Sequence, residues 1–120
     1  MNSDRAQLNG ELDSGANLSR IADKVRPTGM SIQIRESTHY TEGRYLLVEM
    51  DNVEFRFERI SSTECLVSGE SDRVDQLSEA AIRLSQTFAA SDVRHRFEIY
   101  DGDNRLLGYL HHRWAQGPVD

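Results

Sequence analysis

Two histidines in the last third of the chain are the residues whose type best suits metal binding. Alternation places His95 and His112 on the inward-facing side of two β-type segments within residues 92–114, where we expect them to be diagonal neighbours. A zinc site takes three or four protein ligands, and neither the spacing nor that face supplies a third. We therefore interpret both as structural histidines at the end of a sheet, and we predict no metal and no cofactor.

The one cysteine, Cys65, is the other residue that could do chemistry, as a nucleophile activated by a histidine and an aspartate. It lies in the segment ECLVS, where no helix N-terminus or other local motif would activate the thiol. A cysteine in that setting is normally an inert small hydrophobic residue. The DGDN motif at residues 101–104 lacks the ligand spacing of a calcium loop, and no glycine-rich phosphate loop is present. We therefore name no catalytic residue.

A cationic and aromatic surface is the first of two candidate binding surfaces. Alternation places Arg94 and Arg96 on the outer face of one strand, and Tyr109, His111 and Arg113 on the outer face of the next. We expect Arg94 to lie opposite His111 and Arg96 opposite Tyr109. Arginine and tyrosine are enriched at binding hot spots, and guanidinium groups suit carboxylate or phosphate partners. The alternative is a solvated sheet face whose charges prevent aggregation.

An acidic surface is the second candidate, on the outer face of a hairpin at residues 44–59. Glu49, Glu54 and Glu58 line it, and Glu49 faces Glu54 as a like-charge pair, which is mildly unfavourable for the sheet. A protein that neutralises a basic partner, such as a nuclease toxin or a nucleic-acid-binding protein, would use such a surface to attract it. Solubility alone is the competing explanation.

The hairpin that carries the acidic surface is the clearest structural prediction. Asp51 and Asn52 form a two-residue turn pair between two β-type segments. Closing the turn there gives pairs that are apolar and share one face, namely Met50 with Val53, Val48 with Phe55, and Leu46 with Phe57. The turn residues and the hydrophobic pattern therefore indicate the same register. Because this register places large apolar side chains on one face, another element must cover that face.

A second hairpin, at residues 92–114, positions the cationic surface. Its turn lies at residues 101–104, and a turn of either two or four residues pairs Tyr100 with Arg105. That register sets Phe97 opposite Gly108, whose lack of a side chain would make room for the ring.

Two further strands are predicted from shorter patterns. Residues 30–36 alternate in polarity as a half-buried strand does, and residues 64–68 form another. The turn before the second of these strands leaves its register open. Either Leu66 or Val67 then faces Phe57.

Residues 71–90 form the one long helix, capped by Ser71 or Asp72. Its apolar stripe follows helical spacing through Val74, Leu77, Ala81, Leu84 and Phe88. The predicted fold is therefore a single α+β domain: an antiparallel sheet in the order β-β-β-β-α-β-β with one long helix packed on one face. We place this domain at residues 30–116, followed by a polar tail at residues 117–120.

Residues 1–29 differ in composition from the rest of the chain, being polar and rich in Asn, Ser, Gly and Asp. Helical spacing predicts a short helix at residues 17–26, which is too short to be stable alone in water. The segment is therefore either disordered or docked onto this domain or a partner. Chain termini favour the first alternative, so we predict a flexible N-terminal segment.

Composition narrows the function classes. The 120 residues carry a net charge of −6, which makes nucleic acid an unlikely partner. No apolar segment approaches the length of a membrane span, so we expect no membrane association. A single cysteine suits a reducing compartment, and we expect a cytoplasmic protein.

We predict a non-enzymatic module that binds another protein through a charged sheet face, as an inhibitor, immunity protein or chaperone would. One alternative is a small enzyme or metal-binding protein that uses His95, His112 and Cys65. Another is a self-associating structural or adaptor protein, a homodimer for instance, formed through an exposed edge strand.

Overall fold

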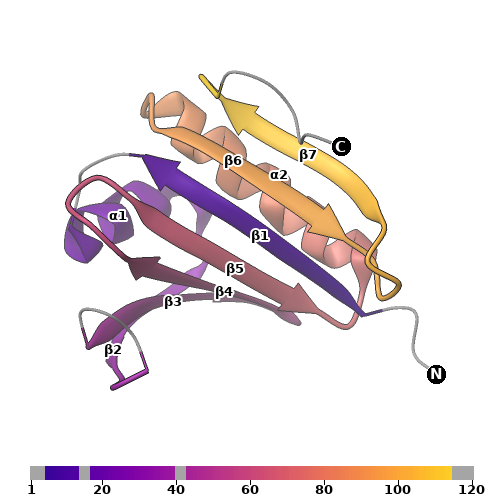
Figure 1. The fold of residues 1–120 in the computed structure, drawn as a ribbon, viewed down its shortest axis with the longest axis horizontal. Coiled ribbons are helices and arrows are strands. Elements are labelled where there is room, and N and C mark those ends of the chain that lie inside the picture. Colours follow the sequence, from indigo (N-terminus) through magenta and orange to yellow (C-terminus); the bar gives the residue numbers. More distant parts are fainter. Residues whose placement is uncertain (1–4, 14–16, 40–42, 115–120) are drawn as a thin grey trace.

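Residues 5–13, 17–39 and 43–114, which the computed structural model describes, form a seven-stranded antiparallel sheet with two helices on one face (Figure 1). In chain order the elements are β1 (Ala6–Asp13), α1 (Leu18–Val25), the 3-10 helix η1 (Arg26–Thr28), β2 (Ser31–Glu36), β3 (Arg44–Met50), β4 (Val53–Arg59), β5 (Cys65–Ser71), α2 (Val74–Ala90), β6 (Arg94–Tyr100) and β7 (Leu106–His112). Across the sheet the strands follow the order β2-β3-β4-β5-β1-β6-β7. The predicted fold class, an antiparallel α+β domain with one long helix on one face, is confirmed.

Strand β1 is an interior strand of the sheet and was not predicted. It pairs with β5 on one side and with β6 on the other. Its inner positions are buried, among them Leu8 and Leu12, while its outer positions are polar. The prediction of a flexible segment at residues 1–29 is therefore wrong for the described part of that segment. Gly10 interrupts the apolar alternation, so the strand has too weak a pattern to be recognised without its neighbours.

Helix α1 confirms the predicted short helix and docks onto this domain. The Asn17 side chain caps it by accepting a hydrogen bond from the Arg20 amide at 2.9 Å. Its buried side chains, Leu18, Ile21, Ala22 and Val25, join the core beneath the sheet. Burial of this face supplies the stability that two helical turns lack in isolation.

The first hairpin has the predicted register, with Val48 opposite Phe55 and Leu46 opposite Phe57. On its other side Phe57 faces Val67, which decides between the two alternatives for β5. Helix α2 begins at Val74, later than predicted, because β5 continues through Ser71. Neither Ser71 nor Asp72 is the N-cap of this helix, because that position is occupied by Arg73, whose side chain makes no capping hydrogen bond. The Ser71 hydroxyl instead accepts a hydrogen bond from the Arg73 amide at 3.1 Å, ahead of the first turn.

The register predicted for the second hairpin is wrong by two residues. Asp101 closes the loop, because its carboxylate accepts hydrogen bonds from the Asp103 and Arg105 amides while its own amide bonds the Arg105 carbonyl. Tyr100 consequently pairs with Leu106, and the ladder carries an irregularity between Ile99 and Tyr100. The alternation of inner and outer faces is still as predicted, since a shift of two preserves it.

The glycine that makes room for Phe97 is Gly10 of β1, not Gly108. Gly10 lies directly opposite Phe97, and a Cβ on Gly10 would lie 2.5 Å from the ring atom Cδ1. Gly108 instead faces Ile99, with its nearest contact at 3.6 Å. Phe97 and Phe88 belong to the fully buried aromatic centre of the core, which lies between the sheet and α2.

Candidate functional site

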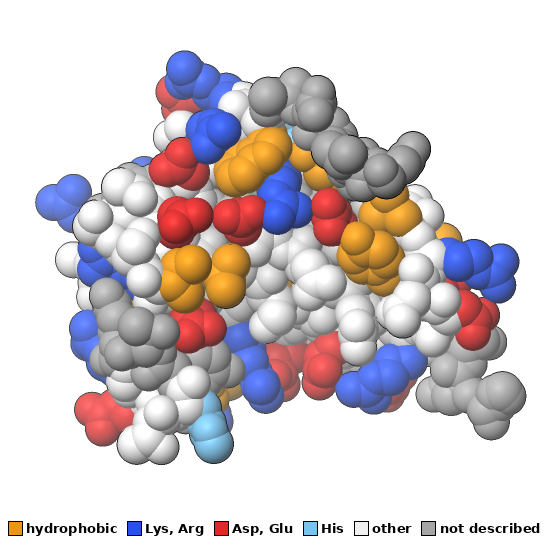
Figure 2. Space-filling view, viewed as in Figure 1, with side chains coloured by type: hydrophobic (Ala, Val, Ile, Leu, Met, Phe, Trp, Pro, Cys, Tyr) orange, Lys and Arg blue, Asp and Glu red, His pale blue; other side chains and the backbone are white. Residues whose placement is uncertain are grey.

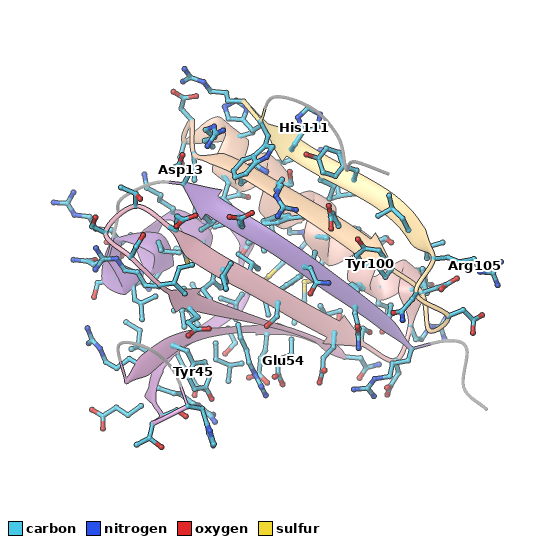
Figure 3. The ribbon with its side chains drawn as sticks, in the orientation of Figure 1. Asp13, Tyr45, Glu54, Tyr100, Arg105 and His111 are labelled. Carbon is cyan, nitrogen blue, oxygen red and sulfur yellow. The ribbon has the colours of Figure 1, made fainter. Side chains whose placement is uncertain are left out.

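The two candidate surfaces lie on one continuous face of the sheet. The helices α1 and α2 cover one face of the sheet, and Figure 1 views the sheet from the side away from them, which we call the open face. Glu54 on β4 and His111 on β7 both project from the open face, on either side of β5 and β1 (Figure 3). Charged side chains of both signs and small apolar patches cover this face (Figure 2). The acidic and cationic surfaces are therefore two halves of one surface.

Acidic side chains hold the arginines of the cationic half in ion pairs. Arg94 pairs with Asp13, and Arg96 pairs with Glu11 and, at 3.1 Å, with Glu98. Two of these partners, Asp13 and Glu11, come from β1, and the flexible N-terminal segment predicted from the sequence would not place them here. The surface predicted to be cationic is thus largely neutralised by its own neighbours.

The corrected register also changes the cross-strand partners in this half. Arg96 lies opposite His111, and Tyr109 lies opposite Glu98. The rings of Tyr109 and His111 stack at a centroid distance of 5.1 Å. Arg113 lies beyond the end of β7, where its guanidinium group binds the Asp92 carboxylate at 2.7 Å.

Trp114 belongs to this half and was missed as a site residue. The Arg94 guanidinium carbon lies 4.2 Å from the centre of the Trp114 ring, and that of Arg96 lies 5.5 Å away. The available signal was a tryptophan at the end of a strand facing alternating arginines. The ring covers both guanidinium groups, which further reduces their availability to a partner.

Three carboxylates line up across adjacent strands in the acidic half. Glu49 of β3 lies directly opposite Glu54 of β4, and Glu54 lies directly opposite Glu70 of β5. We call these three residues the acidic row. Arg56 pairs with Glu54, and Arg5 pairs with Glu70 at 3.3 Å. The row borders a depression of about 270 Å³ that is also lined by Asp51 and Asp72.

The third predicted acidic residue, Glu58, lies away from the row. It lines a second depression, of about 290 Å³, in the middle of the open face. Other residues lining that depression are Asn9, Glu11, Arg56, Leu66, Ser68, Arg96 and Glu98. The surface is hollow here because the small side chains of Asn9 on β1 and Ser68 on β5 lie between longer charged side chains on β4 and β6. This central depression connects the two halves.

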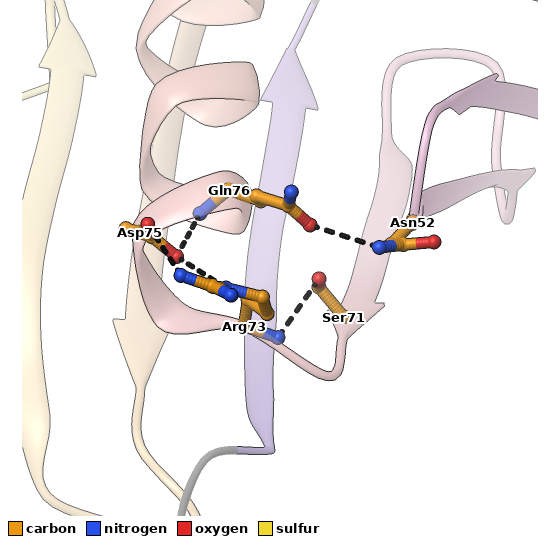
Figure 4. A network of polar contacts seen from close by, with 5 residues as sticks. All are labelled: Asn52, Ser71, Arg73, Asp75 and Gln76. Carbon is orange, nitrogen blue, oxygen red and sulfur yellow. Dashed lines mark hydrogen bonds and ion pairs between the residues drawn. The ribbon is translucent and has the colours of Figure 1, made fainter.

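Polar contacts tie the acidic half to α2 (Figure 4). Asn52, in the turn after β3, donates a hydrogen bond to the Gln76 side chain at 3.2 Å. Arg73 donates two hydrogen bonds to Asp75, and this ion pair lowers the pKa of the Asp75 carboxyl group. The turn of the first hairpin is therefore anchored to the helix beneath the sheet, which holds the acidic row in position.

His95 and His112 lie directly opposite each other, not diagonally as predicted, with ring centroids 6.2 Å apart. Both ring nitrogens of His95 have partners: Nδ1 lies 2.8 Å from the Val93 carbonyl and Nε2 lies 2.7 Å from the Ser85 hydroxyl. Nδ1 must donate to the carbonyl, so Nε2 accepts from Ser85. Burial lowers the pKa of His95, which favours this neutral form.

No group of three or more His, Cys, Asp or Glu side chains converges to hold a metal ion within the described residues. His112 binds the Asp92 carboxylate at 2.9 Å. Cys65 is buried, and Leu12 of β1 lies between it and His95, facing both. Two strand spacings, roughly 10 Å, therefore separate the thiol from the imidazole, too far for a nucleophile and its base.

The sequence matches no protein-family model, and it shows no significant similarity to any curated protein. In the part of the chain that the structure describes, neither α1 nor α2 has the length and apolar character needed to cross a membrane.

Proposed function

We propose that the protein is a non-enzymatic module, of the inhibitor, immunity or chaperone type, that binds a basic segment of another protein on its open face. The observation that carries the proposal is the acidic row, Glu49, Glu54 and Glu70, on the sheet face opposite α1 and α2. We also propose a cytoplasmic location, because a single buried cysteine suits a reducing compartment.

The acidic row is costly for the isolated sheet. Directly opposed like charges destabilise a strand pair, and this row contains two such pairs in succession. Arg56 and Arg5 offset part of the repulsion at Glu54 and Glu70. A cationic partner would relieve the remainder and would be attracted over a distance by the negative field.

The central depression offers a seat for one side chain of the partner. Leu66, at its edge, is 40% exposed and offers apolar contact area beside Glu58. A long basic side chain could lay its methylene groups against Leu66 and place its charge near the carboxylates. We assign the partner's main contacts to the acidic row and this depression.

The cationic half has a different role in this proposal. Arg94 and Arg96 are paired with carboxylates of β1 and β6 and lie against Trp114. We propose that they stabilise the junction between β1 and β6. Reversing their charge should therefore weaken the fold, whereas reversing the acidic row should weaken binding.

The test is a tagged pull-down from the native host, with and without nuclease, read by mass spectrometry. We expect one stoichiometric, nuclease-resistant protein partner that binds more weakly at higher salt. The variant Glu54→Lys with Glu58→Lys should lose it while keeping the wild-type circular dichroism spectrum. A nuclease-sensitive set of partners would contradict the proposal.

A matched control changes the net charge equally on the other side of the molecule. Asp23→Lys with Glu79→Lys places the same reversal on exposed positions of α1 and α2. This variant should retain the partner. Equal loss of binding in both variants would show that net charge, not the open face, attracts the partner.

A further inference from the structure

Strand β2 forms one edge of the sheet and is exposed along most of its length. Among the described residues it pairs with β3 alone, so the backbone groups on its other side face no strand of that part of the chain. Within Ser31–Glu36 only Ile32 is half-buried, and Ile34 is 40% exposed although it lies on the helix side of the sheet. An exposed, unprotected edge of this kind is a template for pairing with another strand.

The two edges of the described sheet differ in their protection. At β7 the ladder is irregular between Ile99 and Tyr100, whereas a helix contacts both edge strands, α2 at β7 and α1 at β2. Asp92 binds His112 and Arg113 at the end of that strand. Edge β2 has regular pairing throughout, contains no proline, and carries charge only at its last two positions. Apart from these two charges, it lacks the usual features that prevent edge-to-edge association, namely proline and β-bulges.

The sequence of β2 is symmetric in polarity about its third residue. It reads Ser31, Ile32, Gln33, Ile34, Arg35, which is polar, Ile, Gln, Ile, polar. We propose that a second copy of this chain pairs with β2 in antiparallel orientation, with the two-fold axis at Gln33. This register sets Ile32 opposite the partner subunit's Ile34 and Ser31 opposite the partner subunit's Arg35, and no like charges face each other.

Two consequences of this register favour a second copy over an unrelated peptide. The isoleucine pairs join the apolar inner faces of the two sheets and cover Ile34, which the single chain leaves exposed. On the open face, Ser31 lies opposite Glu49 of its own chain. The partner subunit's Arg35 can extend over the small serine towards Glu49, which adds charge complementarity at the end of the acidic row.

The proposal is tested by molar mass in solution, and it does not depend on the partner proposed for the open face. The full chain is measured by sedimentation from 5 to 500 µM, about the range of a weak to moderate interface. We expect a dimer at the upper end and at least a tenfold weaker association for Ile34→Lys. Leu107→Lys, which changes a leucine 49% exposed on β7, should dimerise as the wild type does.

A cross-linking experiment tests the register itself. Gln33→Cys lies opposite its own copy, so mild oxidation should give a disulfide-linked dimer, with the buried Cys65 unreactive. Ser31→Cys should not cross-link, because the proposed register separates the two thiols by roughly 13 Å along the strands. A monomer at all concentrations, equal cross-linking of both variants, or dissociation by Leu107→Lys alone would each overturn the proposal.

Discussion

The hydroxyl group of Ser85 and the Nε2 atom of His95 lie 2.7 Å apart between α2 and β6, and both side chains are buried. The hydroxyl donates this hydrogen bond, because Nδ1 of the same ring already donates to the Val93 carbonyl. The core therefore contains a histidine that the fold keeps neutral. This arrangement makes stability depend on pH in a direction that can be worked out.

We expect the protein to lose stability as pH falls below about 6.5, the ordinary pKa of histidine. Burial lowers the pKa of His95, so in this range the unfolded chain binds a proton that the folded chain does not. The free energy of unfolding should then decrease by up to about 1.4 kcal/mol per pH unit, levelling off below the folded pKa. Urea titrations from pH 7.5 to 4.5 measure this slope.

Two histidine variants isolate the residue responsible. His95→Gln should flatten the slope, whereas His111→Gln, at an exposed position on the open face, should preserve it. The Asp92 carboxyl group does not account for this slope. Its hydrogen bonds to His112 and Arg113 lower its pKa, so it binds a proton only at more acidic pH. If the free energy of unfolding depends on pH in His95→Gln as it does in the wild type, His95 is not the residue responsible.

Gly10→Ala should destabilise the fold by about 1–3 kcal/mol, the usual cost of overpacking a core. The added Cβ would lie 2.5 Å from both the Phe97 ring and the Arg96 carbonyl oxygen, and a carbonyl in a central strand cannot easily move. Gly108→Ala is the matched control, since its Cβ would meet only Ile99, at 3.6 Å and beyond. Equal stability of the two variants in urea would contradict the packing at β1.

A chain that starts at Met30 should not fold. It lacks β1, which pairs with both β5 and β6, and it lacks the buried face of α1. Amide spectra by NMR should show the narrow dispersion of an unfolded chain. A test in the full-length chain compares two single substitutions on opposite faces of β1. Leu8→Asp, at a buried position, should unfold the protein, whereas Gln7→Asp, at an exposed position, should not.

Glu49→Gln should stabilise the isolated protein while weakening its binding to a basic partner. Removing one charge from the acidic row relieves the repulsion with Glu54 and should add about 0.2–1 kcal/mol at low salt. High salt should abolish the gain. Glu79→Gln on α2 should change neither property. A loss of stability in Glu49→Gln would show that this carboxylate supports the sheet and does not strain it.

Local signals were sufficient for the first hairpin and the long helix. The turn at Asp51 and Asn52 and the apolar alternation on both sides agree, so a register for β3 and β4 could be chosen from adjacent residues. The stripe from Leu77 to Phe88 identifies α2 in the same way. Both patterns depend on contacts within a short stretch of chain.

Of the candidate site, local reasoning predicted the direction of each side chain but not its surroundings. Arg94, Arg96, Tyr109 and His111 lie on the open face as expected, because a shift of two residues preserves alternation. Most of their neighbours could not be predicted, because two of the three carboxylates that pair with the arginines, Asp13 and Glu11, come from β1, more than eighty positions away in sequence.

The sequence by itself determined which face turns inward in β2, β3, β4, β6 and β7, since alternation is a property of the extended backbone at each residue. For β5 the choice between Leu66 and Val67 depended on its pairing with β4. Only the tertiary structure decided that β1 lies between β5 and β6, and that this places the acidic and cationic residues on one surface with β2 at its edge. Strand order is set by burial summed over the whole core, to which Leu8 and Leu12 contribute only when strands distant in sequence meet.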